Sequence, residues 1–334
     1  MIILITGVAG LLGSNFADYI LKNKKDITII GIDNLSGGYK SNINQNIIFY
    51  EEDLLNFDKI EDIFKLHNID YIFHFGAYAA ECLSPFIRKF NYQNNLLTTT
   101  NLVNLSIKYN IKRFIFTSSV AVYGFGNNDN KSFNEEITSK NPIDPYGVAK
   151  LACEMDIKIA STQHNLDYCI LRPHNVYGKK QNIWDIYRNV LGIWMYQILN
   201  NEDITIYGDG EQTRAFTYIA DIMEPIWQSA ISDKSKNQEI NLGGIKEIKL
   251  IDAAKSLLKI TKTNQSIKYL EKRHEVKHVN CDYIKSINLL DYKMITDLEE
   301  GLTIMWEWVQ KQPKKNRTKW DKYELDTGMY GYWK

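Results

Sequence analysis

The sequence has no excess of either charge and no long hydrophobic run. Lys and Arg total 40 and Asp and Glu also total 40, so the 334-residue chain has a formal net charge of zero. Such a balance creates no field that would concentrate nucleic acid or an anionic membrane. No apolar run reaches the roughly 18 residues of a membrane-spanning helix. We therefore expect neither a nucleic-acid partner nor a membrane anchor.

Cysteine is also scarce. The four cysteines, Cys82, Cys153, Cys169 and Cys281, show no CxxC spacing and no clustering with histidine. This pattern predicts inert thiols in a reducing compartment and no metal site. The N-terminus lacks the positively charged region and the long apolar stretch of a signal peptide. The sequence therefore indicates a cytoplasmic protein.

The first half of the chain alternates apolar runs with helical stretches. Because the runs are continuously apolar rather than alternating, they are typical of parallel strands that are covered on both faces. A helical stretch separates each strand from the next, which indicates right-handed βαβ units. We expect an α/β fold with a Rossmann-type doubly wound parallel sheet. The predicted strands are Ile2–Ile5, Ile27–Ile32, Ile47–Tyr50, Tyr71–Phe73, Arg113–Phe116 and Tyr168–Leu171.

The alternation ends after Pro173, where helical stretches mix with short strands such as Ile204–Tyr207. We predict that residues 1–173 form the Rossmann domain and that 215–245 return to it. Residues 174–214 and 246–334 would form a smaller mixed α/β substrate-binding domain, with a ligand cleft between the two. The tail from Pro313 is rich in aromatic residues, which dock either on the body of the protein or on a sister subunit.

A glycine-rich turn follows the first predicted strand. Gly7, Gly10 and Gly13 lie where a tight turn opens a helix, and the helix N-terminus can bind a diphosphate. The spacing is GxxGxxG rather than GxGxxG, and simple turn chemistry is the alternative. Asp33 ends the second strand, 20 residues later, where a carboxylate can bind ribose hydroxyls and repel a 2′-phosphate. With no basic residue beside it in the sequence, Asp33 favours NAD over NADP, although it could simply be a turn residue.

A Tyr-Lys pair stands four residues apart at the start of a predicted helix. This spacing places Tyr146 and Lys150 on one helix face. A phenol with a pKa near 10 is a weak base, but an adjacent ammonium and an oxidised nicotinamide both favour the phenolate. Ser119 ends the fifth strand, where its hydroxyl can face the same cleft. The plainer alternatives are a helix-surface pair and a serine that bonds the backbone.

In this order the motifs resemble those of extended short-chain dehydrogenases/reductases of the NAD-dependent epimerase/dehydratase family, in particular UDP-glucose 4-epimerases. The family has the GxxGxxG spacing of this chain. The resemblance implies that Ser119, Tyr146 and Lys150 are catalytic and that Asn95 supports the active site. It also implies that Ser119 contacts the substrate, and it implies a set of cofactor contacts, which are Gly7, Gly10, Gly13, Asp33, Asn34, Asp53, Leu54, Asn95, Tyr146 and Lys150.

The second half carries the segments that resemble the substrate site of this family. Asn175, in Arg-Pro-His-Asn-Val-Tyr-Gly, and Arg214, in Gln-Thr-Arg-Ala-Phe, would hold the nucleotide diphosphate, where arginines bind bidentately. Arg273 would make a second phosphate or ribose contact, although its segment lacks a proline and is one residue shorter, so Lys272 remains open. A surface salt bridge is the alternative for both arginines. Asn189 is a further expected substrate contact.

The resemblance implies a reversible 4-epimerase that uses bound NAD and a transient 4-keto sugar. The substrates would be UDP-glucose and UDP-galactose, or the N-acetylhexosamine pair if the small Val279 lines the C2 side of the sugar. Related dehydratases and decarboxylases carry carboxylates after the catalytic hydroxyl residue, whereas this chain has Val120 and Ala121. This argues against both reactions.

Several alternatives remain open. The protein could be an oxidoreductase or a 3,5- or 5-epimerase of another nucleotide sugar, such as a heptose or a uronic acid. A catalytically silent dinucleotide sensor is disfavoured because the Ser-Tyr-Lys set is retained. The turn 77–82 is unlike that of known epimerases and favours an unusual substrate, with structural roles preferred for Glu81 and His174. The resemblance also implies a homodimer through helices near 86–109 and 146–164.

Overall fold

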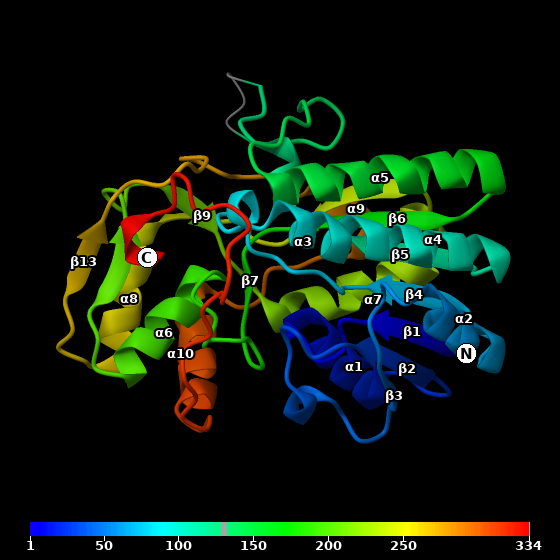
Figure 1. The fold of residues 1–334 in the computed structure, drawn as a ribbon, viewed down its shortest axis with the longest axis horizontal. Helices are drawn as coiled ribbons and strands as arrows, with labels where there is room; N and C mark the ends of the chain where they lie inside the picture. The colour runs from blue at the N-terminus through cyan, green and yellow to red at the C-terminus, as the bar shows by residue number, and fades with distance from the viewer. Residues whose placement is uncertain (128–131, 334) are drawn as a thin grey trace.

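The computed structural model describes residues 1–127 and 132–333, and its centre is a seven-stranded parallel sheet (Figure 1). The strand order is β11-β6-β5-β4-β1-β2-β3. The chain therefore reverses direction across the sheet beside β1, as in a doubly wound Rossmann fold. The strands are β1 (Ile2–Thr6), β2 (Thr28–Asp33), β3 (Ile48–Glu51), β4 (Tyr71–His74), β5 (Arg113–Thr117), β6 (Tyr168–Pro173) and β11 (Gln238–Leu242).

Helices cover both faces of the sheet, and each strand sends alternate side chains to opposite cores. Ile3 and Ile5 of β1 join one apolar cluster and Leu4 joins the other, and all three are fully buried. This confirms the predicted parallel sheet with two covered faces. One face carries α1 (Leu11–Asn23), α7 (Met223–Ile231) and α9 (Ile284–Leu290), and the other carries α2 (Phe57–Leu66), α4 (Thr98–Lys108) and α5 (Pro145–His164).

Helix α1 and strand β11 each have a distinguishing feature. Helix α1 begins at Leu11, inside the glycine turn, because Gly10 serves as its N-cap. Strand β11 forms the edge of the sheet beside β6 in the described chain. Its sequence, Gln-Glu-Ile-Asn-Leu, is mostly polar, so it lacks the continuous apolar run of the inner strands.

The remaining elements form a second layer against the carboxyl ends of the strands (Figure 1). Strand Ile204–Tyr207 is confirmed as β8, and it pairs in parallel with β13 (Ile267–Leu270). No helix of the described chain is long and apolar enough to cross a membrane. The other elements of this layer are β7 (Val176–Tyr177), α6 (Val190–Leu199), β9 (Thr213–Ala215), β10 (Thr217–Tyr218), β12 (Glu247–Lys249), α8 (Leu250–Thr261) and α10 (Leu298–Val309), whereas α3 (Arg88–Tyr92) lies beside α5 in the Rossmann layer.

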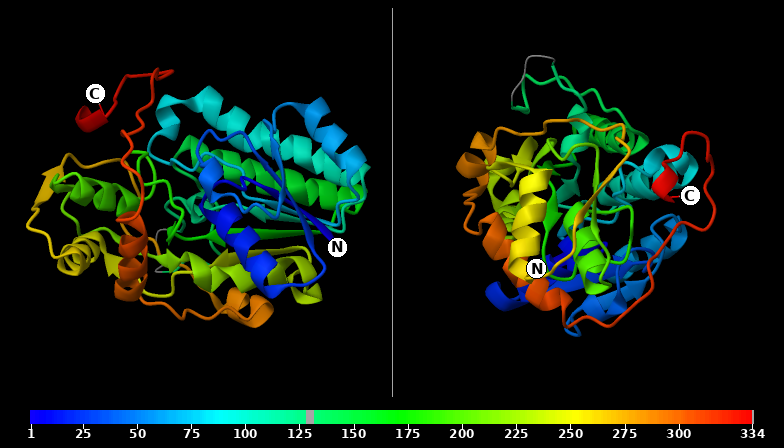
Figure 2. Two further views of the ribbon diagram at one scale, coloured as in Figure 1. Left: turned by 90° about the horizontal axis from the view of Figure 1, so that it is seen from below. Right: turned by 90° about the vertical axis from the view of Figure 1, so that its left-hand side faces the viewer.

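The C-terminal tail docks on the body of its own chain (Figure 2). The Glu324 carboxylate accepts hydrogen bonds from the backbone N–H groups of Lys89 (2.7 Å) and Phe90 (2.8 Å) at α3. Farther along, the backbone N–H of Gly331 donates to Glu271 after β13 at 2.6 Å. The tail therefore connects the Rossmann layer to the second layer.

Candidate active site

A single continuous pocket runs from the glycine turn after β1 to the second layer. Its lining includes Gly7, Gly10 and Asp33 from the Rossmann layer and Arg214 and Arg273 from the second layer. The carboxyl ends of parallel strands meet the second layer here, which is the usual position of ligand sites in doubly wound folds.

The glycine turn requires residues without a Cβ atom. Gly7 has φ +67°, and a Cβ atom there would lie 2.8 Å from the backbone nitrogen of Gly76. Gly13 lies in the first turn of α1 and outside the pocket lining, where a Cβ atom would come within 2.3 Å of the Gly7 carbonyl oxygen. Gly13 therefore permits close packing of helix and turn, while Gly7 and Gly10 border the space for a ligand.

Asp33 lies at the end of β2 and is held by the backbone. Its Oδ2 accepts a hydrogen bond from the N–H of Ala9 (2.9 Å) and its Oδ1 accepts one from Leu35 (2.8 Å). Burial raises the pKa of Asp33, and these two bonds oppose the shift. Asn34 donates to Asp53 Oδ2 at 3.0 Å, and both residues line the pocket together with Leu54. This end has the fixed carboxylate and the glycine cradle that a dinucleotide requires.

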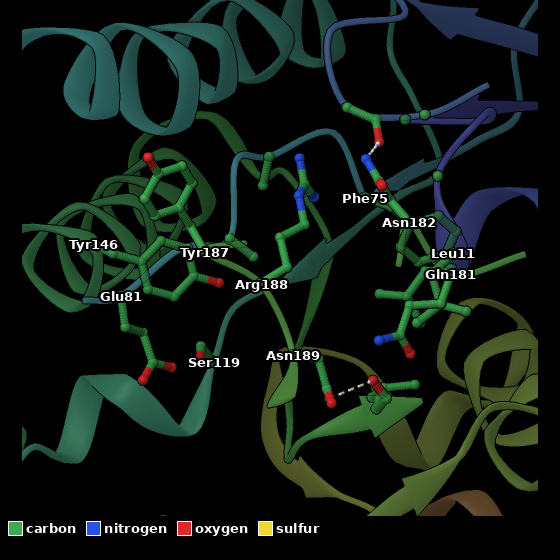
Figure 3. Close-up of a pocket in the computed structure, with 18 of the residues that line it drawn as sticks. Leu11, Phe75, Glu81, Ser119, Tyr146, Gln181, Asn182, Tyr187, Arg188 and Asn189 are labelled. Carbon is green, nitrogen blue, oxygen red and sulfur yellow. Dashed lines mark hydrogen bonds between the residues drawn. The ribbon is translucent and has the colours of Figure 1, made fainter. Parts of the chain in front are cut away.

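The Tyr-Lys pair lies at the start of α5. Asp144 caps this helix by accepting a hydrogen bond from the N–H of Gly147 at 2.8 Å, which fixes the first turn. Tyr146 is 5% exposed, and its hydroxyl points into the same space as Ser119 (Figure 3). Lys150 Nζ lies 5.9 Å from the centroid of the Tyr146 ring and donates to the Thr117 carbonyl at 2.7 Å. The three predicted catalytic residues are thus brought together.

The protein groups do not lower the pKa of Tyr146. Burial raises it first, the Glu81 carboxylate raises it further, and a hydrogen bond with Ser119 opposes them. Burial lowers the pKa of Lys150 to about 8. The sequence predicted that Lys150 and an oxidised nicotinamide together lower the pKa of the Tyr146 hydroxyl. The protein groups alone do not lower it. A bound oxidised nicotinamide supplies hydride-accepting chemistry and a positive charge that favours the phenolate.

Asn95 lies behind the site rather than in its lining. It is 1% exposed, and its side chain accepts a hydrogen bond from the Tyr78 N–H at 2.8 Å and donates to Asn91 at 2.8 Å. Asn91 in turn donates to the Pro145 carbonyl at 2.9 Å. Asn95 therefore connects the turn after β4 to the start of α5, next to Tyr146.

The sequence model of the NAD-dependent epimerase/dehydratase family matches residues 3–243 of this chain. That match spans the sheet, the glycine turn and the Tyr-Lys pair described above. The chain belongs to this family. It is an NAD-dependent enzyme of the nucleotide-sugar epimerase/dehydratase class, with the Rossmann fold that its sequence predicts.

Similar proteins share the architecture over nearly their whole length. The putative UDP-glucose 4-epimerase of Methanocaldococcus jannaschii is 32% identical over 95% of this chain and 100% of its own length. The structure of UDP-glucose 4-epimerase from Thermotoga maritima with UDP-glucose has 32% identity and a TM-score of 0.86, covering 93% of this chain and 99% of that one. UDP-glucuronic acid 4-epimerase of Bacillus cereus, solved with UDP-glucuronic acid and NAD, has 28% identity and a TM-score of 0.83, with coverage of 93% and 99%.

The two arginines expected to bind a diphosphate converge on one carboxylate. Arg214 lies 2.9 Å from Glu275, and Arg273 Nη2 lies 3.9 Å from the same oxygen. The Arg273 guanidinium also stacks on Tyr207, 3.9 Å from the ring centroid, and its buried Nε lacks a hydrogen-bond partner among the described residues. Both arginines line the pocket with Asn175 and Asn189, whereas Lys272 does not. Their roles in substrate binding stay predictions.

Val279 and His174 both lie outside the pocket lining, and of these two the sequence predicted a sugar contact only for Val279. Val279 is 7% exposed and packs with Val120 and Val122 in a small apolar cluster outside the pocket lining. His174 is also outside the lining, and burial lowers its pKa to about 3. Glu81, by contrast, lines the pocket near Tyr146 and Ser119, although the sequence favoured a structural role (Figure 3).

Arg188 is a pocket residue that the motifs do not reveal. It lies between β7 and α6, and a Cβ atom on Gly37 would meet its Nη2 at 2.3 Å. Its charge acts on Asp33, so a cation does stand near this carboxylate although none is adjacent in the sequence. Asp185 orients it through a 2.9 Å salt bridge. A residue brought in from over 150 positions away along the chain leaves no local signal beside Asp33.

Proposed function

We propose that the enzyme is a nucleotide-sugar 4-epimerase that works through a transient 4-keto sugar. UDP-glucose and UDP-galactose, or their N-acetylhexosamine counterparts, are the proposed substrates. The observation that carries this proposal is that Tyr146 and Ser119 face the same space (Figure 3), in a pocket that is also lined by the glycine turn, Asp33 and the Arg214–Arg273 pair. The named activities of the similar proteins support it.

In this proposal each residue has one task. Tyr146 takes the proton from the sugar 4-hydroxyl while hydride leaves C4, and it returns the proton after the hydride is delivered to the opposite face. Ser119 orients the reacting oxygen. Lys150 positions Tyr146, while Asn175, Asn189, Arg214 and Arg273 hold the nucleotide so that the keto sugar turns without leaving the site.

The residues after Ser119 support epimerisation over dehydration. Val120 is 8% exposed and packs in the apolar cluster with Val279, and neither Val120 nor Ala121 lines the pocket. An acid–base pair next to the reacting oxygen is therefore absent from this turn. Glu81 is a carboxylate that the fold brings to the site from another segment. The lack of a carboxylate after Ser119 therefore describes this turn and not the whole site.

Product analysis tests this proposal. Purified protein is incubated with UDP-glucose or UDP-N-acetylglucosamine without added cofactor, and the products are separated by chromatography. We expect the corresponding galacto isomer and no net change in the NAD to NADH ratio. A 4-keto-6-deoxy sugar, carbon dioxide or stoichiometric NADH would refute a 4-epimerase.

A further inference from the structure

We propose that Glu81 selects the sugar, favouring neutral hexoses over uronic acids. The inference rests on the proposed function and adds a substrate preference to it. Glu81 would accept hydrogen bonds from sugar hydroxyls at the reacting end of the pocket and repel a sugar carboxylate.

The position of Glu81 is the first support. It lies in the segment that follows β4 and precedes α3, beside the reacting end of the pocket. Figure 3 shows its carboxylate directed toward the space that Tyr146 and Ser119 also face. Its side chain remains accessible to water within the pocket and forms no hydrogen bond in the described part of the chain. The carboxylate is thus available to a ligand.

The turn holds Glu81 in place from both sides. Tyr78 is fixed by Asn95, as described above, and the Ser84 hydroxyl donates to the Glu81 carbonyl at 2.7 Å. Ser84 Oγ also accepts a hydrogen bond from the Tyr146 N–H at 3.1 Å. The backbone of Glu81 is therefore coupled to the residue that carries out proton transfer.

The charges around Glu81 place its titration near neutrality. The pKa of Glu81 is raised to about 7: desolvation is the largest cause, Asp144 and Glu275 also raise it, and Arg214 and Arg273 oppose them. Tyr146 and Cys82 are neutral at that pH because burial raises the pKa of each, whereas burial raises the pKa of Asp144 to about 6, so this carboxyl group titrates just below Glu81. Above pH 7 the Glu81 carboxylate is charged, and below it the group is neutral.

This chemistry distinguishes two sugar classes. A hydroxyl donates to an ionised carboxylate through a charge-assisted hydrogen bond. A uronate instead brings a second negative charge into a partly desolvated site, where like charges repel strongly. The discrimination should therefore grow as the pH rises from 6 to 8.

Binding measurements test the proposal without relying on turnover. The NAD-loaded protein is prepared with Tyr146→Phe, which blocks proton transfer, and titrated with UDP-glucose and with UDP-glucuronate by calorimetry at pH 6 and pH 8. Glu81→Gln removes the charge, and Glu81→Asp retains it. Glu61→Gln removes one charge from α2 on the distant surface and serves as the matched control. Bound NAD, quantified by absorbance, shows that each variant is folded.

With Glu81 present, we expect UDP-glucose to bind at least about tenfold more tightly than UDP-glucuronate at pH 8, which is about 1.4 kcal/mol. This ratio should fall at pH 6. Glu81→Gln should bring it close to one at both pH values, whereas Glu81→Asp and Glu61→Gln should retain it.

An unchanged ratio in Glu81→Gln, or a ratio independent of pH in the parent, overturns the proposed role of Glu81 and leaves the epimerase proposal standing. If the preference holds but the unmodified enzyme inverts neither sugar at C4, the epimerase proposal fails and the role of Glu81 in selection stands. Binding of neither nucleotide sugar overturns both.

Discussion

At the scale of single residues, Tyr146 is the group on which the chemistry depends. It is nearly buried, and Ser84, Ser119 and Asp144 fix the first turn of α5 around it. We predict that Tyr146→Phe lowers kcat by about 10²–10⁴-fold, the usual contribution of a general acid–base group. Steady-state assays with UDP-glucose measure this, and the content of bound NAD should stay unchanged.

Tyr109→Phe provides the matched control for this variant. Tyr109 follows α4, and its hydroxyl bonds to Glu61 far from the pocket. The substitution should leave kcat at the level of the unmodified enzyme. If Tyr146→Phe retained more than a tenth of that activity, another group would have to transfer the proton.

Two buried histidines should make folding sensitive to acid. Burial lowers the pKa of His74 and of His174 to about 3, from an ordinary value of 6.5. The unfolded chain therefore binds more protons below pH 6.5, so stability falls as the pH drops through this range. Between pH 7.5 and 5.5 the two residues should together cost roughly 2–3 kcal/mol of unfolding free energy.

Urea unfolding at the two pH values measures this loss. His74→Asn should reduce the difference between them by about half, because each histidine binds one proton on unfolding. His164→Asn changes a histidine at the exposed end of α5 and should leave the difference as it was. Equal pH dependence in all three proteins would contradict the assignment to the buried rings.

At the residue scale, the sequence is most informative where local spacing decides the position of a side chain. Gly7, Gly10 and Asp33 lie within the unit β1–α1–β2, and Tyr146 and Lys150 lie one turn apart on α5, and all five line the pocket. The pocket positions of Arg188 and Glu81 depend on how distant segments meet, and Val279 follows the shortened Arg273 segment, where spacing no longer fixes which residue lies at the sugar. Such contacts follow from tertiary packing, which local spacing does not encode.

At the scale of elements, the tail closes one side of the pocket. Arg317 and Tyr332 line it, and Trp333 packs with Phe86 and Tyr187. We predict that deletion of residues 314–334 lowers the melting temperature and raises the KM for UDP-glucose about tenfold or more, because pocket wall and buried aromatic surface are lost together. Thermal unfolding and steady-state kinetics test both effects.

A point substitution within the tail serves as the control for the deletion. Asp321 is exposed, so Asp321→Asn should change neither the melting temperature nor KM. A truncated enzyme with the original KM would show that the tail serves the fold and not the substrate. The composition of the tail predicted that it docks, but aromatic residues alone do not identify the surface on which they pack.

Element prediction succeeded for the inner strands and was least accurate at boundaries and edges. The strands β1 and β5 are buried on both faces, which produces the continuous apolar runs seen in the sequence. The edge strand β11 contains the polar residues Gln238, Glu239 and Asn241, so it has no continuous apolar run. The predicted return of 215–245 to the Rossmann domain stays a proposal about domain boundaries.

At the scale of the whole molecule, we propose a homodimer through α4 and α5, which lie side by side in Figure 1. Val148, Met155 and Ile159 of α5 are 41%, 56% and 52% exposed, at spacings that place them on one helix face. Met155→Glu should convert the dimer into monomers by burying a charge in this interface. Light scattering coupled to size-exclusion chromatography measures the mass.

Ile295→Glu is the control for this interface. Ile295 is 78% exposed but lies near Asp221, away from α4 and α5. This variant should remain dimeric. An unmodified protein that is monomeric at micromolar concentration would contradict the proposed assembly.

The most direct test of the central claim follows the hydrogen on C4. UDP-glucose carrying deuterium at C4 is incubated with the purified enzyme in ordinary water, and the product is examined by NMR. A hydride that leaves C4 and returns to the opposite face predicts UDP-galactose with deuterium retained at C4 and no solvent hydrogen on any ring carbon. Loss of the label to solvent, its appearance at another carbon, or inversion at C3 or C5 would contradict a 4-epimerase.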